Sequence, residues 1–172
     1  MQFRTHFLLL GVLFCTIIAT VFFSDINLYN RKLIFLNNKP KKILIIIAHS
    51  DDETIGMGGT IKRHATAGDE INVVSMTNGV NSRENSNQSD IIKRQKSARK
   101  ASKSLGFSWL KQFDFPDNQL DVVPLIKIVK TIESVKDIFH PELVYTHCGA
   151  DLNIDHQIVL QAVLTAFRPR FK

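Results

Sequence analysis

The sequence predicts an α/β domain in which helices cover both faces of a mostly parallel sheet. Residues Ile43–Ile47 are five consecutive aliphatic residues, a pattern typical of a strand buried on both faces. Strand and helix patterns alternate after it. Gly68 and Gly106 mark the ends of two of the expected helices, because glycine commonly follows a helix C-terminus. Repeated strand–helix units with right-handed crossovers give a parallel sheet that is covered on both sides.

The expected strands and helices follow one another without internal repeats. In the doubly wound order 3-2-1-4, with strands numbered along the chain, the first and fourth strands are neighbours, and the loops after them open into one crevice. Residues far apart in the chain therefore meet at that crevice. In chain order the elements are strand 43–47, helix 54–67, strand 71–76, helix 90–105, strand 110–115, helix 123–139, strand 143–146 and helix 155–167.

A hydrophobic segment precedes this domain. Residues Phe7–Phe23 contain no charge over 17 positions, which is short for a membrane span and slightly long for a signal-peptide core. No clear A-x-A cleavage site follows, which favours an uncleaved anchor over a removed signal or a buried helix. Arg31 and Lys32 follow the segment, and they favour a cytoplasmic position for the rest of the chain without settling it. We expect a membrane-associated protein with an anchor or signal in residues 1–24, a linker in 25–40 and the α/β domain in 41–172.

The chain is basic, with a formal net charge of +6 and a pI of about 9.4. Much of this charge lies on the expected helix 90–105, where it is typical of a solvated helix face and also suits contact with anionic lipid. No nucleic-acid-binding motif accompanies it, so nucleic acid is not an expected partner. The basic residues of this helix are Lys93, Arg94, Lys96, Arg99, Lys100 and Lys103.

A polar cluster, His49-Ser50-Asp51-Asp52-Glu53, follows the first strand directly. Open α/β sheets bind their ligands at this carboxyl edge of the strands. One interpretation is a capping box, in which Ser50 and Glu53 satisfy backbone amides at the start of the next helix. The acids would then stabilise the positive end of the helix dipole. This interpretation leaves His49 without a role.

A metal site is the second interpretation of the same cluster. The loop after the fourth strand, THCGADLNIDH, carries another group of His and Asp residues, which the strand order brings to the same crevice. A catalytic zinc uses three protein ligands and leaves a position for water, whose pKa falls to about 7. His49, Asp52 and His156 would be the ligands, and Asp51 would remain free to act as general base.

Six segments of the chain match blocks of one known family. They are AHSDDE (48–53), where the family has AHPDDE, GMGGT (56–60), TNGVNSRE (77–84), FPDNQLD (115–121), NIDH (153–156) and the wider block 144–169. Residues 41–169 thus resemble the LmbE-like, or PIG-L, family of zinc-dependent N-deacetylases. The resemblance implies a Rossmann-like fold and hydrolysis of an N-acetyl group, usually on an amino sugar. It also implies that His49, Asp52 and His156 bind Zn²⁺, with Fe²⁺ as an alternative metal, and that Asp51 is the general base.

The chain departs from the family pattern in three places. Ser50 replaces the usual proline, and Asn153 stands where many members carry a histidine that assists the tetrahedral intermediate. We expect His147 to take that catalytic part, and a weakened role is the alternative. The chain also stops at Lys172, earlier than family members usually do, so we expect the C-terminal part of the domain to be missing. The alternative to an enzyme is therefore a truncated, inactive, membrane-tethered remnant that still binds metal.

Four further residues are candidates for binding the substrate, which we expect to be an N-acetylated amino sugar on a lipid or another carrier. Arg83 follows the second strand and suits an acidic or hydroxylated group, although an exposed structural arginine is an equal alternative. Asp117 and Asn118 follow the third strand and suit sugar hydroxyls, but P-D-N is also a plain turn signal. Asn153 is the fourth candidate. The sequence does not indicate an oligomeric state.

Overall fold

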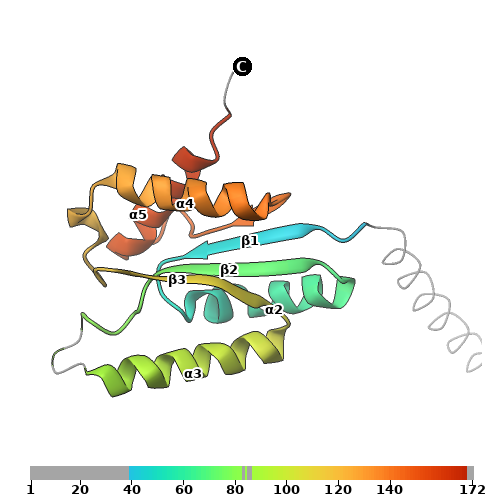
Figure 1. Ribbon diagram of the computed structural model, residues 1–172, viewed down its shortest axis with the longest axis horizontal. Coiled ribbons are helices and arrows are strands. Elements are labelled where there is room, and N and C mark those ends of the chain that lie inside the picture. The colour runs from blue at the N-terminus through green and yellow to red at the C-terminus, as the bar shows by residue number, and fades with distance from the viewer. Residues whose placement is uncertain (1–38, 83, 85–86, 170–172) are drawn as a thin grey trace, which may run out of the picture. The chain divides into compact units, whose positions relative to one another are not determined.

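The computed structural model describes residues 39–82, 84 and 87–169, and in this part the chain forms a four-stranded parallel sheet (Figure 1). The strand order is β3-β2-β1-β4, so the predicted order 3-2-1-4 is confirmed. Each strand agrees with its predicted position to within two residues. The strands are β1 (Lys42–Ile47), β2 (Glu70–Thr77), β3 (Ser108–Phe115) and β4 (Leu143–Tyr145).

Four α-helices connect and follow these strands: α2 (Asp52–Ala67), α3 (Gln88–Leu105), α4 (Leu125–Phe139) and α5 (Ile154–Ala166). The predicted helix 123–139 is confirmed as α4, which begins two residues later because Pro124 is its N-cap residue, and a short 3₁₀ helix (Leu120–Val122) precedes it. Gly68 and Gly106 end α2 and α3 with positive φ angles of 86° and 90°, as expected for glycine after a helix.

The aliphatic residues of β1 divide between two cores because successive strand residues point to opposite faces of the sheet. Leu44 and Ile46 pack in the core that α4 and α5 cover, whereas Ile43, Ile45 and Ile47 belong to the core under α2. Figure 1 shows α4 and α5 on one side of the sheet and α2 and α3 on the other. An uninterrupted aliphatic strand is therefore required at this position.

The start of α2 differs from the capping-box interpretation, which is wrong. Asp51 is the N-cap residue, and its side chain makes no capping hydrogen bond. The Glu53 carboxylate is buried and accepts a hydrogen bond from the Thr54 hydroxyl at 2.6 Å. It is Asp52, through Oδ2, that accepts the backbone N–H of His49 at 2.8 Å. Of the three acids at this turn, Asp52 is the one that contacts His49, whose imidazole the capping box left unexplained.

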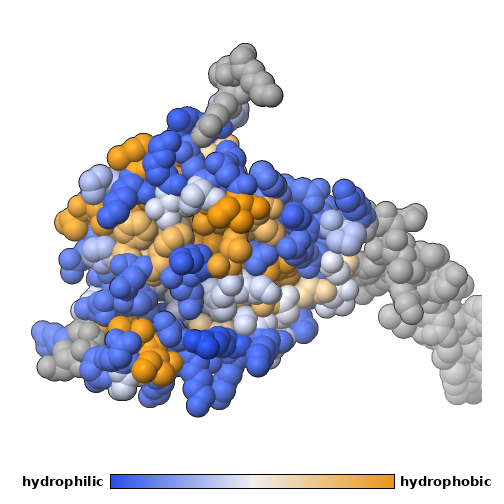
Figure 2. Space-filling model, in the orientation of Figure 1, coloured by the Kyte–Doolittle hydropathy of each residue, from blue (hydrophilic) through white to orange (hydrophobic). Residues whose placement is uncertain are grey.

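Helix α3 presents five of its six basic residues to solvent, as predicted for a solvated face. Arg94 is the exception, since its side chain is 18% exposed and points toward the loop after β1. Figure 2 shows hydrophilic residues over much of the surface on the visible side, with an apolar patch near the beginning of α3. Ile92, in that part of the helix, is 57% exposed.

The predicted anchor at residues 7–23 lies outside the described residues, as does nearly all of the predicted linker. The division at residues 24 and 40 and the membrane localisation therefore stay predictions. Within residues 39–82, 84 and 87–169, no helix combines the length and the apolar character needed to cross a bilayer.

Candidate metal centre

The loops after β1 and β4 meet at one edge of the sheet, as the strand order predicts. The two strands pair in parallel, with Ile45 opposite Tyr145, so the chain leaves both strands at the same end. The backbone N–H of Ala48 donates a hydrogen bond to Nε2 of His147 at 2.9 Å, which ties one loop directly to the other. Clusters that are distant in the sequence therefore share one small region.

The three predicted metal ligands lie together in this region. Nδ1 of His49 is 3.2 Å from Nε2 of His156, and Oδ2 of Asp52 is 3.5 Å from the first atom and 3.4 Å from the second. Ligand atoms at about 2.0–2.2 Å from a tetrahedral zinc ion are separated by roughly 3.3–3.6 Å. The observed triangle fits three corners of such a tetrahedron and leaves the fourth corner for another group.

Each of the two imidazoles is held by a carboxylate on its other nitrogen. Nε2 of His49 is 3.1 Å from Asp155 and 3.3 Å from Asp117, and Nδ1 of His156 is 2.7 Å from Asp151. Carboxylates at this position fix the tautomer and ring orientation of metal-binding histidines. Two other groupings of possible ligands are His49 with Asp117 and Asp155, and His156 with Asp151 and His147. Both include carboxylates that contact these second nitrogen atoms.

The electrostatics of the site favour a positive charge. Burial alone would lower the pKa of His49, but hydrogen bonds to Asp155 and Asp52, with the charges of Asp52 and Asp117, raise it to about 9. Burial would raise the pKa of Asp52, yet its hydrogen bonds from His49 and the charge of His156 leave that pKa below its usual value. Without a metal, a proton on His49 balances these carboxylates, and a bound cation would take its place.

His147 lies next to the candidate metal ligand His156. Its ring stacks on that of His156, with centroids 3.9 Å apart and an angle of 12° between the planes. Burial, followed by the charge of His156, lowers the pKa of His147 to about 4, so the ring is neutral. Nε2 of His147 already accepts a hydrogen bond from the Ala48 amide, so the ring supports the loop after β1. Its predicted catalytic role stays a prediction.

A cavity of about 310 Å³ opens beside the ligands. Asp51, the predicted general base, lines it together with His49, Asp52 and His156. The Asp51 side chain is 43% exposed, which leaves it accessible to water and substrate.

The candidate substrate-binding residues occupy different positions around this cavity. Asn118 and Asn153 both line it, although Oδ1 of Asn153 also caps α5 by accepting the amides of Asp155 and His156. Asp117 is 3% exposed, and its oxygens accept hydrogen bonds from Thr77 and Ser82 besides contacting His49. Asp117 also lines the cavity. Its contact with His49 makes it a support for that ring, and its predicted role in binding substrate stays a prediction. Arg83 lies outside the described residues.

Sequence reasoning did not assign roles to three residues that the structure brings to the site. Asp155 is fully buried and accepts the amides of Asn118 and Leu120 besides contacting His49. The supporting roles of Asp155 and Asp151 could have been predicted, because both residues are close in sequence to the proposed ligand His156 and metal-binding histidines commonly pair with a carboxylate. Arg94 could not have been predicted in this way, since it lies in a run of basic residues on α3.

A family model described as "PIG-L: GlcNAc-PI de-N-acetylase" matches residues 44–167. The chain belongs to the PIG-L family. An "Uncharacterized deacetylase YaiS" from Escherichia coli K12 is 34% identical over 139 residues, which cover 76% of this chain and 70% of that protein. The resemblance predicted from the sequence motifs is thus confirmed.

Solved structures share the fold at lower identity. One is the N,N'-diacetylchitobiose deacetylase of Pyrococcus horikoshii, with a TM-score of 0.63, 24% identity and coverage of 81% of this chain and 57% of that chain. Another is GalB of Pseudomonas putida, a 4-carboxy-2-hydroxymuconate hydratase, with a TM-score of 0.60, 24% identity and coverage of 73% and 55%. The chain therefore spans a little over half of these structures. Because one of the two is a hydratase, the fold alone does not determine the reaction.

Proposed function

We propose that this chain is a metal-dependent hydrolase that removes the N-acetyl group of an amino sugar of the N-acetylglucosamine type. The observation that carries the proposal is the triangle formed by His49, Asp52 and His156, whose sides of 3.2–3.5 Å fit a tetrahedral metal beside a cavity that Asp51 lines. Membership of the PIG-L family supports the deacetylase reaction. Zn²⁺ is the proposed metal, because two imidazoles and a carboxylate suit it, although Fe²⁺ accepts the same ligands.

Each residue of the proposed site has its own part in the reaction. A bound divalent ion supplies a Lewis acid that polarises the amide carbonyl and makes water a stronger nucleophile. Asp51 accepts the proton as the oxygen of water bonds to the carbonyl carbon. The carbon–nitrogen bond then breaks, and the proton passes to the nitrogen, so the products are acetate and a free amine. Asp151 and Asp155 hold the two ligand imidazoles in place throughout.

The proposed substrate follows from the polar groups of the cavity and from the family. Asn118 and Asn153 line the cavity with amide groups, which can donate to and accept from sugar hydroxyls. The family description names a GlcNAc-containing lipid, and the Pyrococcus structure is named for an N-acetylated disaccharide. Both names support an N-acetylated amino sugar, on a carrier that we leave open between a lipid and a glycan.

Release of acetate from N-acetylglucosamine and N,N'-diacetylchitobiose by the zinc-loaded protein tests this function. Asp51→Asn keeps the shape of the side chain but cannot accept the proton, so we expect it to retain zinc and lose about 10²–10⁴-fold in turnover. Lys96→Ala, an exposed change on α3, is the control and should leave turnover unchanged. A folded, zinc-loaded wild-type protein that releases no acetate from either sugar would instead support a metal-binding protein without this activity.

A further inference from the structure

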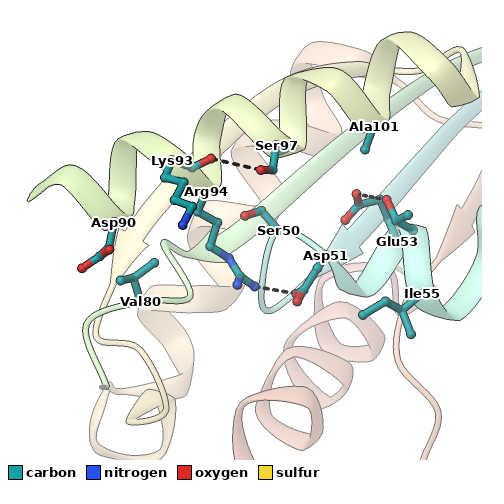
Figure 3. A pocket seen from close by; sticks show the side chains of 12 residues that line it. Ser50, Asp51, Glu53, Ile55, Val80, Asp90, Lys93, Arg94, Ser97 and Ala101 are labelled. Atoms are coloured by element: carbon teal, nitrogen blue, oxygen red, sulfur yellow. Dashed lines mark hydrogen bonds and ion pairs between the residues drawn. The ribbon is translucent and has the colours of Figure 1, made fainter. Parts of the chain in front are cut away.

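We infer that Arg94 is a positioning residue that holds the Asp51 carboxylate in place for its role as base. This inference rests on the proposed function, because that function makes Asp51 the general base. The contact between Arg94 and Asp51 is observed whether or not that function is correct. Nη2 of Arg94 lies 2.6 Å from Oδ1 of Asp51, and Figure 3 shows the two side chains pointing toward each other between α3 and the turn before α2. Arg94 also lines the cavity that holds the three metal ligands.

The guanidinium of Arg94 lies against the turn after β2. A Cβ atom at Gly79 would lie 2.8 Å from Nε and 3.0 Å from Cζ of Arg94, so the guanidinium would have to shift to make room for it. Gly79 has a φ angle of 67°, and its amide donates to the Thr77 hydroxyl at 3.1 Å. The turn after β2 therefore leaves space that the guanidinium of Arg94 occupies. A side chain at position 79 would displace the guanidinium from Asp51.

The Asp51 side chain needs such a partner because its own backbone does not fix it. It lies in the turn before α2, makes no capping hydrogen bond and is 43% exposed. The salt bridge occupies Oδ1 and leaves Oδ2 as the oxygen that is free to accept a proton. A planar guanidinium restricts the direction of the carboxylate more strongly than a flexible ammonium does. Arg94 thus restricts the Asp51 carboxylate to one of the orientations that the turn allows.

The arrangement of charges makes this contact specific. Among the residues that the structure describes, Asp51 is the ion-pair partner of Arg94, and Nε of Arg94 is buried without a hydrogen-bond partner. The neighbouring metal ligand Asp52 instead faces His49, His147 and His156. Removing Arg94 therefore releases the base while the contacts between the metal ligands remain.

The test compares Arg94→Ala, Arg94→Lys and Gly79→Ala with the wild type, and Arg99→Ala, an exposed guanidinium on the same helix, is the control. We expect Arg94→Ala to lower kcat by about 10–100-fold, because small displacements of a reacting group have effects of this size. KM should change less than about threefold, and the zinc content and Tm should stay near those of the wild type. Arg94→Lys should recover part of kcat, and Gly79→Ala should lower kcat in the same direction as Arg94→Ala.

Two further measurements separate positioning from a general structural effect. Added guanidinium at millimolar concentration should restore part of the activity of Arg94→Ala but none of the activity of Asp51→Asn. The variant that combines Arg94→Ala with Asp51→Asn should be no slower than Asp51→Asn alone, because Arg94 acts only through Asp51. Arg94→Ala with unchanged kcat, a loss confined to KM, or losses that add in the double variant would each overturn the inference.

Crystal structures of the wild type and of Arg94→Ala test the inference without any turnover. We expect one orientation of the Asp51 carboxylate in the wild type and several, or a different one, in the variant. The same single orientation in both proteins overturns the inference even if the proposed reaction is correct. Conversely, an ordered-to-disordered change at Asp51 in a protein that releases no acetate would support the positioning contact and count against the proposed function alone.

Discussion

Binding of Zn²⁺ to the metal-free protein should release about one proton, and its apparent affinity should rise steeply with pH. The reason is the imidazole of His49, whose pKa of about 9 means that it is protonated at neutral pH. Nε2 keeps its proton toward Asp155, so the proton on Nδ1 must leave before that nitrogen can bind a metal. Below pH 9, each pH unit then changes the apparent affinity about tenfold, or about 100-fold from pH 6 to pH 8, equivalent to about 2.7 kcal/mol.

Isothermal titration calorimetry at pH 7 in buffers of different ionisation enthalpy measures the proton release directly. Asp117→Asn is the matched variant, since it removes one charge that raises the pKa of His49 without removing a proposed ligand. In that variant, fewer protons should be released at pH 8 and the pH dependence should be shallower. Proton release near zero at pH 7, with an affinity that is constant from pH 6 to pH 8, would refute the proposed metal ligation by His49.

Two further predictions concern the pH dependence of stability. Burial raises the pKa of Glu53, so the wild type should lose stability as pH rises above about 4.5, where this carboxyl ionises in the unfolded chain. Glu53→Gln should therefore gain Tm relative to the wild type between pH 5 and pH 8, and a constant difference in Tm would contradict this. Burial and His156 lower the pKa of His147 to about 4, so the metal-free protein should lose on the order of 3 kcal/mol as pH falls from 6.5 to 4, when the unfolded chain takes up that proton. Urea unfolding of His147→Asn should lack this part of the loss, and identical pH profiles of variant and wild type would exclude it.

The sequence predicted the sheet because its strands carry a strong pattern. The aliphatic run of β1 is buried on both faces, and the alternation of strands and helices indicates a parallel sheet, for which the doubly wound order 3-2-1-4 was the expectation. The helix boundaries were predicted to within two residues, and α4 begins after Val123 and Pro124 because Pro124 is its N-cap residue. The local pattern does not show that a 3₁₀ turn precedes it.

The candidate metal ligands were predictable for a different reason. Residues His49 and Asp52 follow one strand and His156 follows a neighbouring one, so topology alone brings them to the same edge. The supporting contacts were harder to predict, because a buried carboxylate such as Asp117 looks like an ordinary turn residue in the sequence. Its role depends on the position of the His49 ring, which only the folded structure provides.

Arg94 shows most clearly what a sequence pattern leaves out. On α3 it is one basic residue among six, and helical periodicity does not distinguish it from exposed neighbours. Its inward direction depends on the turn after β2, where Gly79 leaves space for the guanidinium. Such a contact joins two loops and a helix, so it is a property of tertiary structure.

The adjacent acids Asp51 and Asp52 have different partners because the backbone changes conformation between them. Asp51 has φ and ψ angles of −155° and −17°, which are not helical, whereas Asp52 is the first residue of α2. The Asp52 carboxylate therefore turns back to the amide and ring of His49, while Asp51 faces Arg94. The change of backbone conformation before α2 thus separates the candidate metal ligand Asp52 from the proposed general base Asp51.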